Sequence, residues 1–125
     1  MNAADNEHKG NFIKNKTLFQ SFHNAFNGFR LAIVSERNMR IHLSAALAVV
    51  VLGILLRIDL IRWGVLMLTV GMVLISELLN TSLEKLTDMV TSEYSDEAKQ
   101  VKDIAATAVL VAAIVSVIVG ILVFY

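Results

Sequence analysis

Four polar residues with helical spacing stand at the end of a long apolar stretch in this 125-residue chain. Glu77, Asn80, Glu84 and Asp88 follow one another at intervals of three, four and four residues. On a helix of about 3.6 residues per turn, these intervals place all four side chains on one narrow face. Carboxylates that share a face repel one another, and a divalent cation with a phosphate ligand is the natural compensation. The pattern indicates phosphate chemistry assisted by a metal ion.

Three further polar clusters stand at the ends of apolar stretches. Glu36 precedes the first stretch, Ser92-Glu93-Tyr94 follows the second, and Lys102-Asp103 precedes the third. Two carboxylates from different helices, Glu36 and Glu84, could hold one Mg²⁺ together with oxygens of a nucleotide phosphate. Lys102 could neutralise the phosphate charge that the metal leaves uncovered. We therefore expect these clusters to converge on one surface.

Glu77 differs from the other polar residues because it lies deepest in the apolar sequence. An ionised carboxylate well inside a bilayer costs about 2.5 to 3.5 kcal/mol. Loss of water makes a carboxylate a stronger base, so Glu77 is suited to take a proton from a lipid hydroxyl. Phosphoryl transfer depends mainly on positioning and charge neutralisation, so a small helical site can suffice.

The elements that carry these residues are predicted to be membrane-spanning helices. The chain is 56% hydrophobic, contains no proline and no cysteine, and has a mean hydropathy of +0.65. Apolar runs at 41–56, 63–79 and 104–125 predict three spans, and the last is long enough to cross a hydrocarbon core of about 30 Å. Balanced charge, with 11 basic and 11 acidic residues, gives no support for nucleic-acid binding.

An amphipathic helix is predicted before the first span. Leu18, Phe22, Phe26, Phe29 and Ile33 recur at intervals of three or four residues, which places an aromatic face beside nearby cationic side chains. Such a helix suits the membrane interface, although packing on a partner protein is the alternative. We expect an all-α integral membrane protein with a polar, disordered segment at 1–16 and a single domain at 17–125.

The basic residues predict the topology. Six of the eleven Lys and Arg residues precede the first span, and three more lie between the start of the polar stripe and the third span. The positive-inside rule therefore places the N-terminus and the second connection in the cytoplasm. The predicted site faces the compartment that contains ATP.

The polar stripe resembles a motif of the prokaryotic diacylglycerol kinase family, which consists of small integral-membrane lipid kinases. The matching residues are Glu77-Leu-Leu-Asn-Thr-Ser-Leu-Glu-Lys-Leu-Thr-Asp88, followed by Lys102-Asp-Ile-Ala-Ala-Thr-Ala-Val-Leu. The similarity extends from about Ser21 to the C-terminus. Glu36-Arg-Asn-Met-Arg resembles the Gram-positive branch of this family, whose preferred substrate is undecaprenol.

The resemblance implies a homotrimer in a bacterial plasma (inner) membrane, with three spans and an interfacial helix per subunit. It also implies roles for the matching residues. At the lipid substrate it implies Glu77 as catalytic base and Arg30 as a nearby residue; Glu36 and Glu84 would be metal and nucleotide ligands. Lys102 and Asp103 would contact the nucleotide, Ser92, Glu93 and Tyr94 would lie near it, and Asn80 and Asp88 would be further site residues. The chain departs from the family pattern at Thr87, where an aliphatic residue is usual, and at Asn24, where a tyrosine that contacts the nucleotide is expected.

We therefore predict Mg-ATP-dependent phosphorylation of undecaprenol, which gives undecaprenyl phosphate. Diacylglycerol, which would give phosphatidic acid, is the alternative acceptor. A transporter subunit or a non-catalytic membrane scaffold is a further alternative, because polar residues also join helices by hydrogen bonds. We interpret His42 as a packing residue, since no second histidine stands at ligand spacing. A chain of this size can hardly enclose ATP and a lipid alone, so we expect sites shared between neighbouring subunits.

Overall fold

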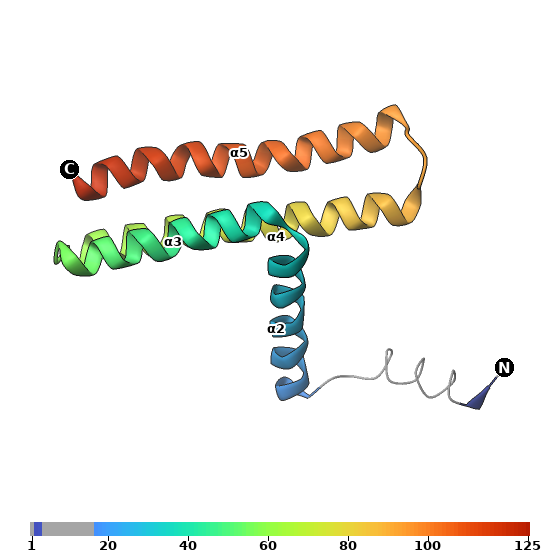
Figure 1. The fold of residues 1–125 in the computed structure, drawn as a ribbon, viewed down its shortest axis with the longest axis horizontal. Coiled ribbons are helices and arrows are strands. Elements are labelled where there is room, and N and C mark those ends of the chain that lie inside the picture. The colour runs from blue at the N-terminus through green and yellow to red at the C-terminus, as the bar shows by residue number, and fades with distance from the viewer. Residues whose placement is uncertain (1, 4–16) are drawn as a thin grey trace. The chain divides into compact units, whose positions relative to one another are not determined.

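A computed structural model describes residues 2–3 and 17–125, and Figure 1 shows their helices. The elements in chain order are α2 (Leu18–Ser35), α3 (Arg37–Leu55), α4 (Leu60–Val90) and α5 (Asp96–Phe124). The part of the chain described here contains no β-strand, so the predicted all-α fold class is confirmed. One compact unit ends at Leu31, and a second, Ala32–Tyr125, contains α3, α4 and α5. The disorder expected at 1–16 falls, apart from positions 2–3, outside the described residues.

Three helices, α3, α4 and α5, are long and apolar enough to cross a membrane. The 31 residues of α4 and the 29 residues of α5 exceed what a span needs, because about 20 residues already cross the hydrocarbon core. The apolar run that predicts the second span ends at Leu79, but α4 continues to Val90. The polar stripe therefore lies on the same uninterrupted helix as the apolar segment.

Side-chain caps explain where α4 and α5 begin. The carboxylate of Asp59 accepts a hydrogen bond from the backbone N–H of Arg62 at 2.9 Å. The hydroxyl of Ser95 accepts one from the N–H of Ala98 at 3.1 Å, and Asp96 and Glu97 occupy the first turn of α5. Each cap satisfies a backbone donor that the helix leaves unpaired, and acidic residues favour a helix N-terminus. As a result α5 begins eight residues before the charge-free run at 104–125.

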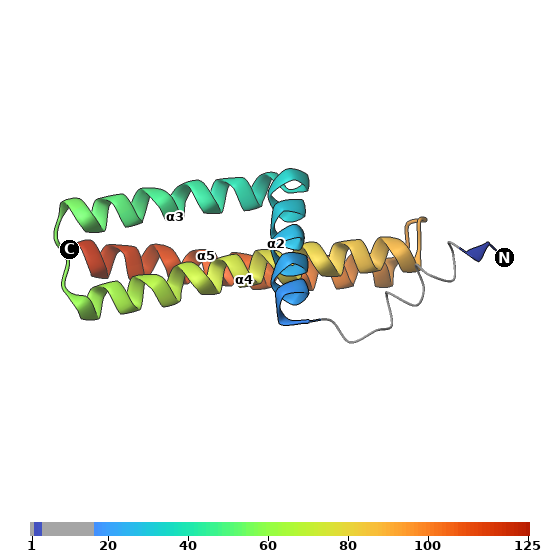
Figure 2. The same cartoon turned by 90° about the horizontal axis from the view of Figure 1, so that it is seen from below.

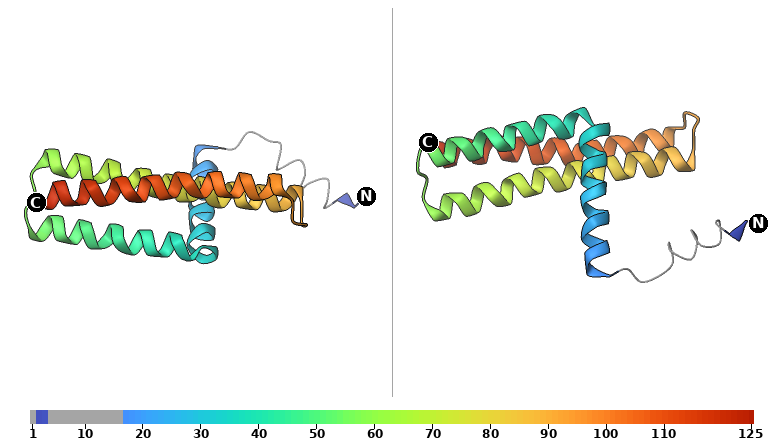
Figure 3. Two further views of the ribbon diagram at one scale, coloured as in Figure 1. Left: turned by 90° about the horizontal axis from the view of Figure 1, so that it is seen from above. Right: turned by 60° about the horizontal axis from the view of Figure 1, so that its bottom comes forward.

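Within the second unit, α3, α4 and α5 run side by side, and successive helices point in opposite directions (Figures 2 and 3). The closest packing joins α4 to α5, where the buried residues Ala105 and Ala112 of α5 are small. Small side chains allow helix backbones to approach each other, which is a common basis of helix association in membranes. This packing fixes the end of α4 against the start of α5.

The break between α2 and α3 falls at Glu36. The backbone of Glu36 is extended, with φ −117° and ψ 115°. Arg40 Nη1 donates hydrogen bonds to the carbonyls of Ile33 at 2.8 Å and Val34 at 3.0 Å. These bonds satisfy backbone acceptors that α2 leaves unpaired at its C-terminus. Arg40 therefore stabilises the turn that presents Glu36.

Three of the four phenylalanines of α2 are exposed, and Phe29 is half-buried. Phe19, Phe22 and Phe26 each expose more than two thirds of their surface within the first unit. Exposed aromatic residues on a helix suit a lipid surface or a partner. The interfacial location of α2 stays a prediction.

The tight connection between α3 and α4 depends on Gly53. A Cβ atom at Gly53 would lie 2.9 Å from Cη2 of Trp63 and 3.2 Å from Cδ1 of Ile58. Trp63, interpreted from the sequence as a membrane-interface anchor, thus also packs over the last turn of α3. A residue larger than glycine at position 53 would displace this indole.

We predict that Gly53→Ala destabilises the protein by about 1 to 3 kcal/mol, because overpacking forces neighbouring side chains out of place. Thermal unfolding in detergent micelles measures the effect. Gly64→Ala is the matched control, since a Cβ at Gly64 has nothing within 4 Å and alanine favours a helix. Equal stability of the two variants would contradict the predicted contact.

Candidate functional site

Glu77 is the most buried charged residue in the described part of the chain. It lies on α4 and exposes 1% of its surface. His42 of α3 lies beside it, with Nε2 3.1 Å from Glu77 Oε1. This is an ion-pair distance, but Oε1 has no hydrogen bond of good geometry. Burial deprives the carboxylate of water, so its chemistry depends on the few groups that reach it.

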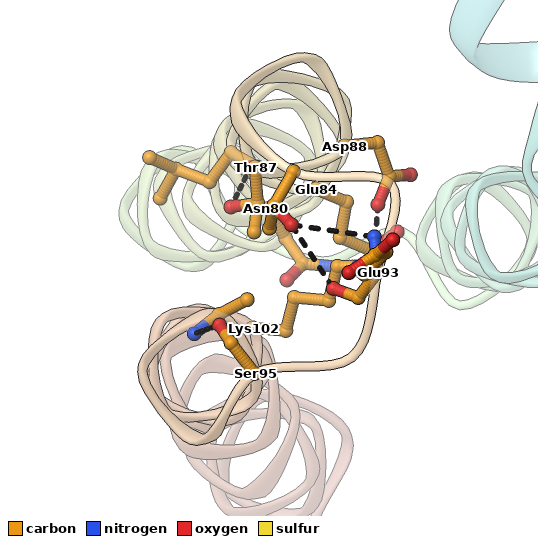
Figure 4. Close-up of polar contacts among 10 residues, drawn as sticks. Asn80, Glu84, Thr87, Asp88, Glu93, Ser95 and Lys102 are labelled. Carbon is orange, nitrogen blue, oxygen red and sulfur yellow. Dashed lines mark hydrogen bonds and ion pairs between the residues drawn. The ribbon is translucent and has the colours of Figure 1, made fainter.

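Two further carboxylates come close to Glu77. The charges of Glu36, at the start of α3, and Glu84, on α4, both act on Glu77. Glu84 Oε1 accepts a hydrogen bond from Asn80 Nδ2 at 3.3 Å (Figure 4). Three of the four acidic residues that the sequence singles out on these two helices are thus within range of one another's charge. We call Glu36, Glu77 and Glu84 the carboxylate cluster.

Buried polar atoms on α4 lack partners in this part of the protein. Asn80 Oδ1 and Thr81 Oγ1, like Glu77 Oε1, are buried and accept or donate no hydrogen bond. Most buried polar atoms in folded proteins have a partner, so a group of such atoms indicates a place where another polar group binds. All three atoms lie within two turns of α4, next to the carboxylate cluster.

A polar pocket of about 360 Å³ lies between the C-terminal end of α4 and the N-terminal end of α5. Its lining contains all the residues predicted for the nucleotide outside the carboxylate cluster: Ser92, Glu93, Tyr94, Lys102 and Asp103. Asp88, the last residue of the stripe, lines it as well. We call this the loop pocket.

Lys102 connects the two helices across the loop pocket. Its Nζ lies 2.7 Å from Asp88 Oδ1, as Figure 4 shows, and its charge also acts on Glu84. Asp103 pairs with Lys99 on the preceding turn of α5, so the adjacent Lys102 and Asp103 have different partners. Lys102 is the cation that stands between the loop pocket and the carboxylate cluster.

Two further residues considered in the sequence, Arg30 and His42, lie outside the loop pocket and the carboxylate cluster. Arg30 is exposed on α2 and belongs to the first unit, so its role near the lipid stays a prediction. His42 does pack at a helix–helix contact, but the sequence reasoning missed that its partner is Glu77. The position of His42 inside an apolar run could have indicated such a partner, because an ionisable residue within a membrane span usually faces a polar group.

Among the residues at 2–3 and 17–125, no group of three or more histidine, aspartate or glutamate side chains is arranged to hold a metal ion. The donors that are present are carboxylate, amide and hydroxyl oxygens, which suit a hard cation such as Mg²⁺. Mg²⁺ is usually bound by one or two carboxylates, and substrate phosphates complete its coordination. The residues present fit such a shared site.

These features define a small multi-pass membrane protein with an acidic cluster on its second span and a polar pocket at the end of that helix. The sequence model of the prokaryotic diacylglycerol kinase family matches residues 23–124. The chain belongs to this family, and it is a lipid kinase that uses ATP as co-substrate. The predicted family and enzyme class are confirmed.

Proteins similar to this chain are named either undecaprenol kinase or diacylglycerol kinase. An undecaprenol kinase of Bacillus subtilis (strain 168) is 40% identical over 107 residues, which cover 86% of this chain and 87% of the relative. A diacylglycerol kinase of Synechocystis sp. is 45% identical over 104 residues, which cover 82% of this chain and 59% of the relative. A diacylglycerol kinase of Escherichia coli (strain K12) is 36% identical over 94 residues, 75% of this chain and 77% of the relative.

We predict that Lys102→Met raises the KM for ATP by about tenfold or more, because a phosphate group loses a charge-assisted contact. Thermal stability should change little, since the ion pair with Asp88 is exposed to solvent. Steady-state kinetics in mixed micelles measures the first effect, and a melting curve measures the second. Lys85→Met removes the same charge outside the loop pocket and serves as control. An unchanged KM for ATP would contradict the role of Lys102.

Proposed function

We propose that the protein phosphorylates undecaprenol with Mg-ATP and produces undecaprenyl phosphate. The activity is supported above all by one observation, the burial of Glu77 near two other carboxylates, Glu84 on the same helix and Glu36 at the start of α3. The choice of acceptor is supported by the Bacillus undecaprenol kinase, which the chain matches over nearly the full length of both proteins. The site is proposed to open to the cytoplasmic face of the bacterial cell membrane.

Glu77 acts as the general base in this proposal. Its carboxylate takes the proton of the lipid hydroxyl while the hydroxyl oxygen forms a bond to the γ-phosphorus of ATP. The bond from that phosphorus to the bridging oxygen breaks, and ADP leaves. Such transfers depend on in-line positioning and charge neutralisation, which a rigid pair of helices can supply.

Glu36 and Glu84 are proposed to hold Mg²⁺ together with phosphate oxygens of the nucleotide. When bound, the ion would neutralise charge on the phosphates. Asn80 keeps the Glu84 carboxylate in place through the hydrogen bond to Oε1. Among the ion pairs of the described residues, none joins Glu36 or Glu84 to a lysine or arginine, although the charge of Lys102 acts on Glu84. Carboxylates in this situation suit a divalent cation.

The loop pocket is proposed to receive the remainder of ATP. Ser92, Glu93 and Tyr94 come from the connection before α5, and Lys102 and Asp103 come from its first turns. Lys102 would exchange its partner Asp88 for a phosphate oxygen. Because Asn24 replaces an expected tyrosine, the adenine should be held less by stacking than in relatives that keep this residue.

We further propose a homotrimer whose active sites are shared between subunits. The helices of one chain leave many large apolar side chains exposed on α3, α4 and α5, which lipids and neighbouring subunits would cover. In this assembly α2 lies in the membrane interface, and Arg30 contacts the lipid substrate. Mixing Glu36 and Glu77 variants tests this arrangement: restored phosphate transfer requires that the two residues of one active site come from different subunits, whereas a cluster built from one chain predicts no restoration.

Diacylglycerol is the second candidate acceptor, because the Synechocystis diacylglycerol kinase is 45% identical over the matched residues. The decisive experiment offers undecaprenol and 1,2-diacylglycerol at equal mole fractions in the same mixed micelles, with radiolabelled ATP. We expect kcat/KM for undecaprenol to be at least about tenfold higher, since acceptor choice is a ratio of these constants. A preference for diacylglycerol would overturn the proposed acceptor, and no transfer to either lipid would overturn the kinase assignment.

Glu77→Gln should lower kcat by about 10²- to 10⁴-fold, the usual contribution of a general base. The amide keeps the size of the side chain, so assembly should be retained and can be checked by chromatography in detergent. Full activity in this variant would exclude Glu77 as base.

Glu84→Ala should raise the Mg²⁺ concentration that gives half-maximal rate by about tenfold or more, because a direct carboxylate ligand is lost. Rates measured across a Mg²⁺ titration at saturating ATP test this expectation. Glu97→Ala, which removes an exposed carboxylate from the first turn of α5, is the control. An unchanged Mg²⁺ dependence would remove Glu84 from the metal site.

A further inference from the structure

The contact between His42 and Glu77 is the one ion pair in the described residues that joins α3 to α4. Nε2 lies 3.1 Å from Glu77 Oε1, and the two side chains expose 21% and 2% of their surface. The buried Glu77 carboxylate depends on this contact, because it cannot find another partner at low cost. Nothing in the proposed phosphoryl transfer has used His42 so far.

We propose that His42 is a positioning residue, which holds Glu77 in the orientation that its role as base requires. This inference rests on the proposed function of Glu77. A carboxylate has two oxygens, and if the imidazole N–H is directed to Oε1, the other oxygen stays available for the lipid hydroxyl. Catalytic hydrogen bonds are often poorly aligned before substrate binds, which accounts for a close contact at Oε1 without good hydrogen-bond geometry.

The surroundings of Glu77 explain why such a residue is needed. Glu36 and Glu84 both act on Glu77 with like charge, which would push its carboxylate away from them. His42 approaches from α3 as a donor and offsets this repulsion. Rotation of Glu77 away from the acceptor would lower the rate of phosphoryl transfer even in a fully folded protein. A misplacement of about 1 Å can lower a reaction rate by about 100-fold.

Space beside His42 makes it possible to test the role of its imidazole separately from its bulk. His42 lines a mainly apolar pocket of about 90 Å³ together with Ala45, Ala46, Leu66, Thr69 and Ser116. Removal of the side chain would enlarge this pocket enough to admit a free imidazole.

Two variants of similar length separate the two roles. His42→Gln keeps an N–H donor near the position of Nε2, whereas His42→Met fills the space without one. We expect kcat of His42→Gln within about tenfold of the wild type and kcat of His42→Met lower by about 100-fold, with the KM for ATP little changed in both. Rates are measured with the acceptor lipid that the wild type prefers and are expressed per folded protein. His23→Met, an exposed histidine on α2, is the control.

A second measurement applies if His42→Met does not assemble. Added imidazole should raise the kcat of His42→Ala and leave that of the wild type unchanged, because the free base can occupy the vacated space. Equal kcat in the Gln and Met variants, or no rescue of His42→Ala, would overturn the proposal. Glu77→Gln separates this failure from that of the proposed function: if Glu77→Gln is inactive while His42→Met keeps the wild-type kcat, only the role of His42 is wrong.

Discussion

Burial of the Glu77 carboxylate between two apolar helices is the constraint on which the site depends. A carboxylate in this environment is stable only if neighbouring groups compensate for lost water. His42 supplies a contact from α3, while Glu36 and Glu84 add like charge. The cluster is therefore electrostatically incomplete within one chain. This incompleteness distinguishes a binding site from a set of hydrogen bonds that merely hold helices together.

The two halves of α4 differ in composition and in what they contribute to the structure. The first half of α4 is apolar and supports the spans, whereas its second half carries polar side chains on the face turned to α3 and α5. Because α5 begins with charged residues at the same end, the loop pocket forms where both helices become polar. Lys102 and Asp88 join the two helices there. No large domain is needed, since short connections keep these ends together.

Much of this arrangement could be predicted from residue types and spacing. The intervals of the stripe place Glu77, Asn80 and Glu84 on one helix face, and the structure brings Glu36 to the same cluster. Hydropathy alone does not give the full lengths of α4 and α5, because it detects the membrane segment and not the polar helix that continues it. The partner of His42 could not be derived either. A contact between helices depends on their rotation about their axes, which a single sequence does not specify.

The connection between α3 and α4, at the other end of α4 from the loop pocket, is fixed by backbone hydrogen bonds and by packing. Arg57 adopts a positive φ of 53°, and the N–H groups of Arg57 and Ile58 return to the carbonyls of Ile54 and Gly53. This is the usual way to end a helix, although glycine is the more common residue there. Together with the packing of Trp63 over Gly53, it fixes how α3 turns into α4 and hence which faces of the two helices meet.

The continuous helix from Glu77 to Asp88 fixes the distance between the two ends of the polar stripe. Eleven residues at about 1.5 Å each separate Glu77, the proposed base, from Asp88 at the loop pocket by about 16 Å. A rigid rod of this kind does not absorb insertions as a loop would. One extra residue between these positions would turn everything beyond it by about 100° and carry Asp88 away from Lys102. Sequence change within this segment is therefore restricted to substitution.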